Sequence, residues 1–284
     1  MAKGMLYIVG TPIGNLGDMS SRALEVLGEA DRIAAEDTRH TRKLLTHFEI
    51  SKPMISYHDH NRKKVGDQLL HYLEEGETIA LVSDAGMPAV SDPGEDLVKL
   101  CIDHDIEVTT IPGPTAFVSA LILSGLSTLR FSFEGFLDRQ KKKRRDQLEA
   151  LKYDQRTLIF YEAPHRLTDT LKDMELVLGD RQAAAVREIT KRYEEAIRLP
   201  LSEMRVYFGE NKPKGEFVLV VDGAPEDLLP PDTNPLLDLS LEDHIRHYLK
   251  EGLRRKEVAA KVAEERGLNK KEVYKLSTTV EIDQ

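Results

Sequence analysis

Short apolar segments alternate with amphipathic stretches along the first 125 residues. The apolar segments have the length of buried strands and lie at residues 5–9, 31–35, 54–57, 78–82 and 107–111. The stretches between and after them carry apolar positions at helical spacing, at residues 20–28, 41–47, 65–75, 95–104 and 115–123. Strands that alternate with helices predict an α/β domain over residues 1–125 with a largely parallel sheet.

A second α/β domain is predicted over residues 126–224. Extended segments lie at residues 131–136, 157–161, 182–187 and 215–221, and helical patterns lie at residues 144–152 and 166–178. Residues 192–198 are expected to connect a strand to a helix. Residues 225–239 predict a linker, because three of the prolines there fall within six residues. Residues 240–284 predict a small domain of three short helices, which is typical both of a helix-turn-helix-like nucleic-acid module and of a dimerisation tail.

Composition limits the class of protein. The chain has 284 residues, a net charge of −9 and one cysteine, Cys101, in a helical pattern. A single cysteine excludes an internal disulfide and a multi-cysteine metal site. The longest apolar run, residues 116–123, is too short to span a bilayer, and we find no targeting peptide. We therefore expect a cytoplasmic protein that does not bind membranes.

Turn-forming loops follow four strands of the first predicted domain, at residues 10–18, 36–41, 83–94 and 111–116. Because the carboxyl ends of parallel strands meet at one edge of a sheet, these loops predict a ligand crevice. The first loop, Gly-Thr-Pro-Ile-Gly-Asn-Leu-Gly-Asp, lacks both the G-x-G-x-x-G dinucleotide fingerprint and the Gly-Lys-Ser/Thr ending of a P-loop. Loops with few charges suit a ligand with adenosine and amino-acid parts better than a polyphosphate.

Polar clusters also follow two strands of the second domain, at residues 161–166 and 187–191. They predict either ion pairs and helix caps or the second wall of a substrate cleft, and their position on consecutive strand ends favours the cleft. His58 and His60 lie two residues apart, but no further convergent His or Cys set surrounds them, so we expect no metal site.

Together and in order, these loops resemble the tetrapyrrole-methylase-like superfamily, and within it the branch that methylates ribosomal RNA. The resemblance rests on residues 10–18, 35–41, 83–94, 112–116 and 162–166, with residues 57–61 and 187–191 also fitting that branch. It covers about residues 5–222. Ring-methylating members carry Gly-x-Gly-Pro-Gly-Asp in the first loop, which this chain lacks, and that difference argues against a corrin or porphyrin substrate.

The resemblance implies two α/β domains with a cofactor cleft between them, a homodimer, and S-adenosylmethionine as the cofactor. The implied reaction is 2′-O-methylation of a cytidine ribose in the decoding region of 16S ribosomal RNA, within the assembled small subunit. The cofactor residues implied by position are Pro12, Asp84, Ala85, Gly86, Pro88, Ser91, Thr115, Ala116 and Ala163, with residues 215–217 as further candidates. The alternatives are a small-molecule methyltransferase and a non-catalytic RNA-binding protein of the ribosome.

Methyl transfer to a hydroxyl calls for alignment with the methyl donor and for a base or a nearby cation. The candidates on strand-end turns are Glu36, Asp37, Glu162, His165, Arg187, Glu188 and Lys191. The predicted RNA contacts are Arg39, His58, His60, Asn61, His165, Arg166 and the cations of residues 139–145, namely Arg139, Lys141, Lys142, Lys143, Arg144 and Arg145. Taken alone, that basic run predicts a solvated loop before a helix; an RNA substrate favours a phosphate-binding patch.

Overall fold

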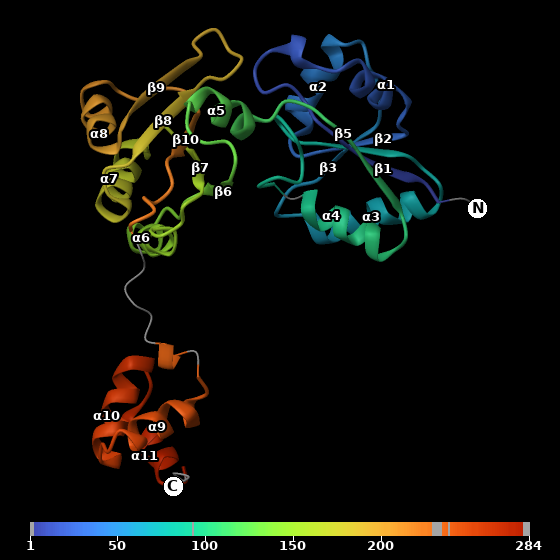
Figure 1. The fold of residues 1–284 in the computed structure, drawn as a ribbon. Coiled ribbons are helices and arrows are strands. Elements are labelled where there is room, and N and C mark those ends of the chain that lie inside the picture. The colour runs from blue at the N-terminus through green and yellow to red at the C-terminus, as the bar shows by residue number, and fades with distance from the viewer. Residues whose placement is uncertain (1–2, 93, 229–234, 238, 281–284) are drawn as a thin grey trace. The chain divides into compact units, whose positions relative to one another are not determined.

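The computed structural model describes residues 3–92, 94–228, 235–237 and 239–280. The chain divides into two compact units, Met1–Ala224 and Pro225–Gln284. Figure 1 shows the first unit as two sheets with helices packed on them, and the second as a group of helices. The α/β class and the two-sheet architecture predicted from the sequence are confirmed. Within the predicted linker, residues 229–234 and 238 lie outside the described residues.

The first sheet is parallel throughout, in the order β3-β2-β4-β1-β5. Its strands are β1 (Met5–Val9), β2 (Arg32–Ala35), β3 (Met54–Ser56), β4 (Ile79–Val82) and β5 (Glu107–Ile111). The helices between them are α1 (Ser21–Glu29), α2 (Thr38–His47), α3 (Arg62–Glu74) and α4 (Gly94–Asp103), and a 3-10 turn, η1, covers Leu16–Asp18. One buried core joins α3 and α4 to the sheet and a second joins α1 and α2 to it, so both faces are covered.

The second sheet is mixed, in the order β6-β7-β10-β8-β9, with only β6 and β7 parallel. Its strands are β6 (Phe131–Phe136), β7 (Thr157–Glu162), β8 (Gln182–Arg187), β9 (Glu195–Pro200) and β10 (Phe217–Val221). Its helices are α6 (Lys141–Ala150), α7 (Leu167–Leu178) and α8 (Leu201–Glu210). The expected connection at residues 192–198 is wrong in part, because Glu195 begins a strand that pairs with β8 as a hairpin. A helix does follow, α8, but the sequence did not predict its bounds.

Helix α5 (Ala116–Ser124) follows the last strand of the first sheet but packs on the second. Its Ala120 and Leu121 are buried against Ile159 and Val220 of the second sheet. On the opposite face of that sheet, Phe160 packs with α6, α7 and α8, as expected for side chains that alternate along a strand. The turn before α5 therefore runs from the last strand of the first sheet to a helix that packs on the second sheet. The predicted boundary at residue 125 stays a prediction.

The second unit contains η2 (Pro235–Leu237), α9 (Leu241–Lys250), α10 (Arg255–Arg266) and α11 (Lys270–Ser277). The Ser240 hydroxyl accepts a hydrogen bond from the Asp243 amide at 3.0 Å and caps α9. Ile245, Val258, Val262 and Val273 form a core of their own. No helix in the described parts of the chain is long and apolar enough to cross a bilayer.

Candidate functional site

The loops after β1, β4 and β5 converge at the carboxyl edge of the first sheet. The Thr11 amide donates to the Gly86 carbonyl at 2.9 Å, and the Gly86 amide returns a bond to the Thr11 carbonyl at 3.1 Å. A Cβ on Gly10 would lie only 2.6 Å from the Cα of Gly113. Glycine is therefore required at Gly10, where the loop after β1 passes the loop after β5. The loops that form the predicted crevice are therefore fixed to one another through contacts between their backbones.

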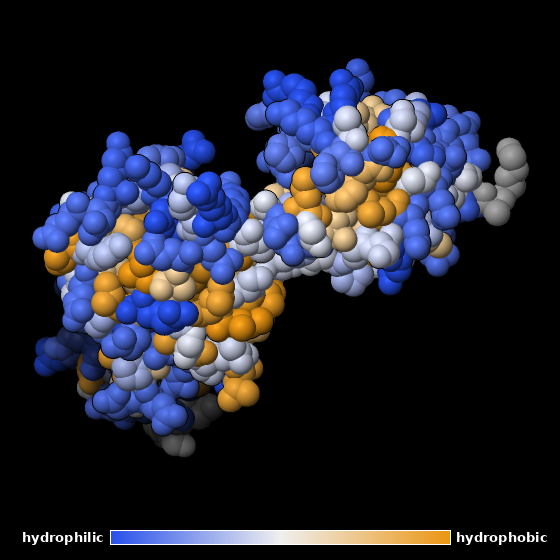
Figure 2. All heavy atoms as spheres, turned by 90° about the horizontal axis from the view of Figure 1, so that it is seen from above, coloured by the Kyte–Doolittle hydropathy of each residue, from blue (hydrophilic) through white to orange (hydrophobic). Residues whose placement is uncertain are grey.

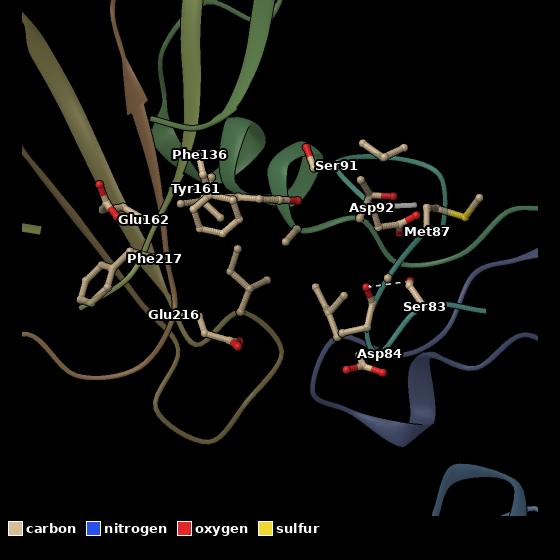
Figure 3. A pocket seen from close by; sticks show the side chains of 18 of the residues that line it. Ser83, Asp84, Met87, Ser91, Asp92, Phe136, Tyr161, Glu162, Glu216 and Phe217 are labelled. Carbon is tan, nitrogen blue, oxygen red and sulfur yellow. Dashed lines mark hydrogen bonds between the residues drawn. The ribbon is translucent and has the colours of Figure 1, made fainter. Parts of the chain in front are cut away.

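A cavity of about 540 Å³ opens between the two sheets and is lined from both sides. Its size lies in the range of small-molecule sites. Figure 3 shows Ser83, Asp84, Met87, Ser91 and Asp92 on one wall and Phe136, Tyr161, Glu162, Glu216 and Phe217 on the other. We call it the interdomain cavity. It is mostly formed by strand-end loops, as the sequence predicted.

Acidic groups lie on the wall formed by the first sheet. Burial raises the pKa of the Glu36 carboxyl above its ordinary value, and the neighbouring charges of Asp84 and Asp92 raise it further. The Asp84 carboxylate accepts a hydrogen bond from the Asp37 amide at 3.0 Å, which ties the loop after β2 to the loop after β4. Glu36 is thus a desolvated carboxylate with increased basicity beside the cavity.

Backbone strain is concentrated in two loops that line the cavity. Ala89 and Ser91 in one loop, and Glu188 and Thr190 in the other, adopt φ angles between 51° and 65° without being glycine. The Asp92 carboxylate holds the first of these loops, accepting bonds from the amides of Ala89 at 2.6 Å and Gly94 at 3.0 Å. Strain of this kind is found preferentially at ligand sites, where the surroundings enforce it.

Lys191 provides a cation on the opposite wall. Its ammonium lies 2.9 Å from a Glu216 carboxylate oxygen and 3.2 Å from Glu188 Oε1. Burial lowers the pKa of Lys191, but the hydrogen bonds to Glu216 and Glu188 outweigh burial and raise it above its ordinary value. Lys191 therefore remains protonated at neutral pH and can stabilise negative charge, but it cannot act as a base.

Aromatic residues form the remaining part of that wall. The rings of Phe136 and Tyr161 lie 5.5 Å apart, and Phe133 contacts Tyr161 at 5.0 Å and stacks on Phe117 at 4.4 Å. Burial raises the pKa of the Tyr161 hydroxyl. Phe136 and Tyr161 of this cluster give one side of the cavity an aromatic, apolar surface.

Most of the residues expected to bind the cofactor line this cavity. Those that do are Asp84, Ala85, Gly86, Ser91, Thr115, Ala116 and Ala163, together with Phe217 and Glu216 of the further candidates. Pro12 and Pro88 are not among the lining residues; Pro88 is buried within its loop, and the adjacent Ile13 and Met87 take their places. A proline next to a lining residue stiffens the loop without facing the ligand.

The catalytic candidates divide into two groups. Glu36, Glu188 and Lys191 line the cavity and are accessible from it. Glu162 also borders it, but its side chain is 1% exposed and accepts bonds from the Ala163 amide and the Thr170 hydroxyl. Arg187 points elsewhere, because its guanidinium pairs with Glu195 at 2.7 Å on the neighbouring strand. Arg187 thus forms an ion pair between two strands, and its role in catalysis stays a prediction.

The basic run of residues 139–145 is mostly helical, which corrects the expectation of a loop. Arg144 is buried and donates to Asp173 Oδ2 at 2.6 Å, and Arg145 donates to Asp173 Oδ1 at 2.7 Å. Arg144 is therefore a structural cation rather than an RNA contact. Lys141, Lys142 and Lys143 are exposed on the first turn of α6.

The other predicted RNA contacts are scattered over unit 1. Arg139, His165 and Arg166 line a second cavity. Arg39 is exposed and pairs with Asp37 at 2.8 Å. The rings of His58 and His60 lie 5.9 Å apart, and the side chain of Asn61 bonds to the backbone of His58 and Ser56, which gives it a role in holding this loop. No group of three or more possible metal ligands occurs among the described residues.

Several lining residues were not singled out from the sequence, although some of them belong to the loops predicted to form the crevice. They are apolar or acidic residues in or next to predicted strands and loops: Ile13, Met87, Val90, Asp92, Phe136, Tyr161, Ile189 and Val218. In the sequence, an apolar residue at the end of a strand follows the same pattern whether its side chain lines a cavity or packs in a core. Asp92 could have been found from its place in the loop after β4, which carries two aspartates.

Comparisons with known proteins agree with this geometry. A sequence model of the family described as "Tetrapyrrole (Corrin/Porphyrin) Methylases" matches residues 5–205. The chain is 52% identical to the ribosomal RNA small subunit methyltransferase I of Halalkalibacterium halodurans, over 96% of this chain and 94% of that protein. It is 50% identical to the protein of the same name from Synechocystis sp., over 99% of each.

The fold also resembles that of solved structures. Uroporphyrin-III C-methyltransferase from Thermus thermophilus, solved as a complex with S-adenyl homocysteine, superposes with a TM-score of 0.55 at 19% identity. The superposition covers 77% of this chain and 97% of that one. At this identity the likeness establishes the fold.

Proposed function

Because the chain belongs to the tetrapyrrole methylase family, and within it to the family of ribosomal RNA small subunit methyltransferase I, we propose that it methylates small-subunit ribosomal RNA with S-adenosylmethionine as the donor. The finer form of the proposal is 2′-O-methylation of a cytidine in the decoding region of 16S RNA. The observation that carries it is a single interdomain cavity of about 540 Å³ that combines polar loops, an aromatic wall, a carboxylate and a cation.

The methyl donor would lie against the loops of the first sheet. In support, Asp84, Ala85, Gly86 and Ser91 present backbone and small polar groups to the cavity. Thr115 and Ala116 lie at the start of α5, and Ala163 lines the same cavity from the second domain. A ligand with a purine and an amino-acid part matches this mixture of aromatic and polar surface.

Methyl transfer is a displacement at carbon: the ribose oxygen bonds to the methyl carbon while the carbon–sulfur bond breaks. The hydroxyl proton must leave, and the sulfonium becomes a neutral thioether. Glu36 has the increased basicity to accept that proton. Lys191 would stabilise the developing oxyanion. The remaining rate enhancement comes from alignment of the oxygen with the methyl carbon and the departing sulfur.

The test is transfer of labelled methyl groups from S-adenosylmethionine to naked small-subunit RNA and to assembled small subunits, with the product nucleoside identified by mass spectrometry. The proposal expects 2′-O-methylcytidine, formed best on assembled subunits. Methylation of porphyrinoid rings but not RNA would support a small-molecule methyltransferase. Binding of RNA without transfer would support a non-catalytic role.

We also propose a homodimer in the cytoplasm. In support, several large apolar side chains around α5 are exposed, among them Ile122 at 68% and Leu129 at 92%. Figure 2 shows hydrophobic residues gathered in patches on an otherwise hydrophilic surface. Light scattering of the full chain tests the dimer: a monomer mass at micromolar concentration would contradict it.

A further inference from the structure

A second cavity of about 590 Å³ adjoins the interdomain cavity. Phe136 and Ala163 line both of them. We call the second one the Arg139 cavity; its other lining residues are Leu137, Asp138, Arg139, Gln140, His165 and Arg166. It lies at the carboxyl ends of β6 and β7, where the loops to α6 and α7 begin. A ligand that extends from the interdomain cavity past Phe136 would enter it.

The Arg139 cavity is cationic. Arg139 and His165 are exposed, and neither forms an ion pair or a side-chain hydrogen bond within the described residues. Arg166 is held in place, because its guanidinium donates to the carbonyls of Leu137 at 2.8 Å and Asp138 at 3.1 Å. Arg166 also lies 3.5 Å from Glu162, and Asp138, the acid among the lining residues, accepts a bond from the Gln140 amide at 2.7 Å and lies 4.0 Å from the Lys143 ammonium. Arg139 and His165 are thus free to bind an anion, and Arg166 positions the loop that carries Arg139.

The start of α6 adds positive charge beside this cavity. Its first turn holds Lys141, Lys142 and Lys143 and no acidic residue. Cations at a helix N-terminus are opposed by the helix dipole, and acids are the usual residues there. Asp173 pairs with the buried Arg144 and with the partly exposed Arg145, and Asp138 lies 4.0 Å from the Lys143 ammonium. An anionic ligand would compensate the charges of Lys141 and Lys142, which form no ion pair within the described residues.

Phe136 is 57% exposed although it is a large apolar residue. It ends β6, and its ring lies 5.5 Å from that of Tyr161. Figure 3 shows the two residues together on the wall of the interdomain cavity. An exposed aromatic ring at the junction of two cavities is suited to stack on a nucleobase, since every base has an apolar face.

From these observations we infer that the Arg139 cavity binds the phosphodiester group on the 3′ side of the methylated nucleotide, with Phe136 stacking on an adjacent base. This inference rests on the proposed function. The 2′-oxygen and the 3′-phosphate are on neighbouring ribose carbons, so an enzyme that reaches the 2′-oxygen must accommodate this phosphate nearby. The cavity that shares Phe136 and Ala163 with the interdomain cavity is adjacent and carries the required positive charge.

The first test compares Arg139→Ala with Lys172→Ala, a matched change of an exposed cation on α7 that lines neither cavity. Loss of a charged hydrogen bond to phosphate lowers kcat/KM for RNA roughly tenfold. Affinity for S-adenosylmethionine, measured by calorimetry, stays at the wild-type value in both variants. Lys172→Ala keeps wild-type kcat/KM.

The second test changes the RNA. Small-subunit RNA is ligated from synthetic pieces so that one neutral methylphosphonate replaces the phosphate 3′ to the methylated nucleotide. The wild-type enzyme loses activity on this RNA, whereas Arg139→Ala loses little more than it has already lost, because both changes remove the same contact. Full additivity of the two losses would overturn the assignment of Arg139 to that phosphate.

The third test concerns stacking. Phe136→Leu keeps an apolar side chain but removes the ring, and we expect RNA affinity to fall roughly tenfold. Phe136→Tyr keeps the ring and restores the affinity. If the wild-type chain methylates no small-subunit RNA, the proposed function fails and this inference with it. If it does, and Arg139→Ala and Phe136→Leu both keep wild-type kcat/KM, only this inference fails.

Discussion

The aliphatic stem of Lys191 lies over Gly14, in the space that a side chain on Gly14 would occupy. Gly14 belongs to the loop after β1, and Lys191 belongs to the loop after β8, so the contact joins the two α/β domains across the interdomain cavity. The ammonium then reaches Glu188 and Glu216. The position of this cation depends on the absence of a side chain in the opposite domain.

Gly14→Ala should therefore displace Lys191 and reduce methyl transfer. The added methyl group overlaps the Lys191 stem, and overpacking of this kind costs about 1–3 kcal/mol. Gly28→Ala is the control, since nothing lies within 4 Å of the added carbon there, and alanine in α1 is neutral or stabilising by up to about 1 kcal/mol. Denaturant unfolding and methyl-transfer assays measure both effects. Normal activity in Gly14→Ala would show that methyl transfer does not require Lys191 in its observed position.

Glu36→Gln should slow methyl transfer and stabilise the fold. The pKa of Glu36 is raised, so the folded protein binds a proton at a pH where the unfolded chain has lost it. The contribution of Glu36 to stability is therefore present at low pH and is lost as the pH rises through the raised pKa. The glutamine variant avoids this cost at neutral pH.

The pH profile of the rate tests the same residue. As a base, Glu36 must be ionised, so the wild-type rate falls as the pH decreases through the raised pKa, and this limb disappears in Glu36→Gln. Calorimetry should give unchanged affinity for S-adenosylmethionine. A variant with wild-type kcat would remove Glu36 from the mechanism.

Asp173→Ala should strongly destabilise the second domain. The Asp173 side chain is 1% exposed, and the change leaves the buried Arg144 without a counter-charge, at a cost of about 3–5 kcal/mol. Asp146→Ala, at an exposed position on the same helix as Arg144, should change the free energy of unfolding by less than about 0.5 kcal/mol. Similar values for the two variants in urea unfolding would contradict the structural role of this ion pair.

Acid unfolding should report on the same carboxylate. Burial raises the pKa of Asp173, but the hydrogen bonds from Arg145 and Arg144 outweigh burial and lower it. Its contribution to stability is therefore present above the ordinary aspartate pKa and is lost as the pH falls through the lowered value. In Asp173→Ala, the free energy of unfolding should depend less steeply on pH in this acidic range.

Lys141, Lys142 and Lys143 changed together to glutamate should weaken RNA binding and flatten its salt dependence. Each phosphate contact that is lost reduces the slope of log K against log salt by roughly 0.7–0.9. The same triple change should slightly stabilise α6, because acids replace cations at its N-terminus. Filter binding at several salt concentrations measures the slope; an unchanged slope would mean that these lysines are only solvated.

A chain that ends at residue 224 should fold and bind S-adenosylmethionine like the full chain. The terminal helices have their own core, and all lining residues of the interdomain cavity lie before residue 224. Its RNA affinity and its mass by light scattering then decide between the two interpretations of the terminal helices. Loss of RNA affinity alone supports a nucleic-acid module, and a monomer supports a dimerisation tail. Failure of this chain to bind the cofactor would contradict the expected independence.

Patterns within single segments predicted much of this fold, because apolar spacing and helix caps involve only residues that are close in the sequence. The strand β1 and the helix α1 follow from apolar spacing and from the Ser20 cap, which accepts the Ala23 amide at 3.1 Å. The loop after β4 could be recognised by its glycines, prolines and aspartates. The strand β9 could not, because Glu195–Pro200 is only partly buried and its pairing with β8 is a tertiary contact.

The sequence by itself determined the α/β class, the family and the strand-end loops that form the cavity, since these depend on residue types at fixed spacing. Only the tertiary structure decided which side chain of a cluster faces the ligand. Arg144 and Lys143 are neighbours in one basic run, yet one is buried against Asp173 and the other is exposed, because consecutive helix residues point in different directions. In the same way, Arg187 pairs along the sheet while Lys191 crosses to Gly14. Such partners come from distant segments, and no pattern within one segment reveals them.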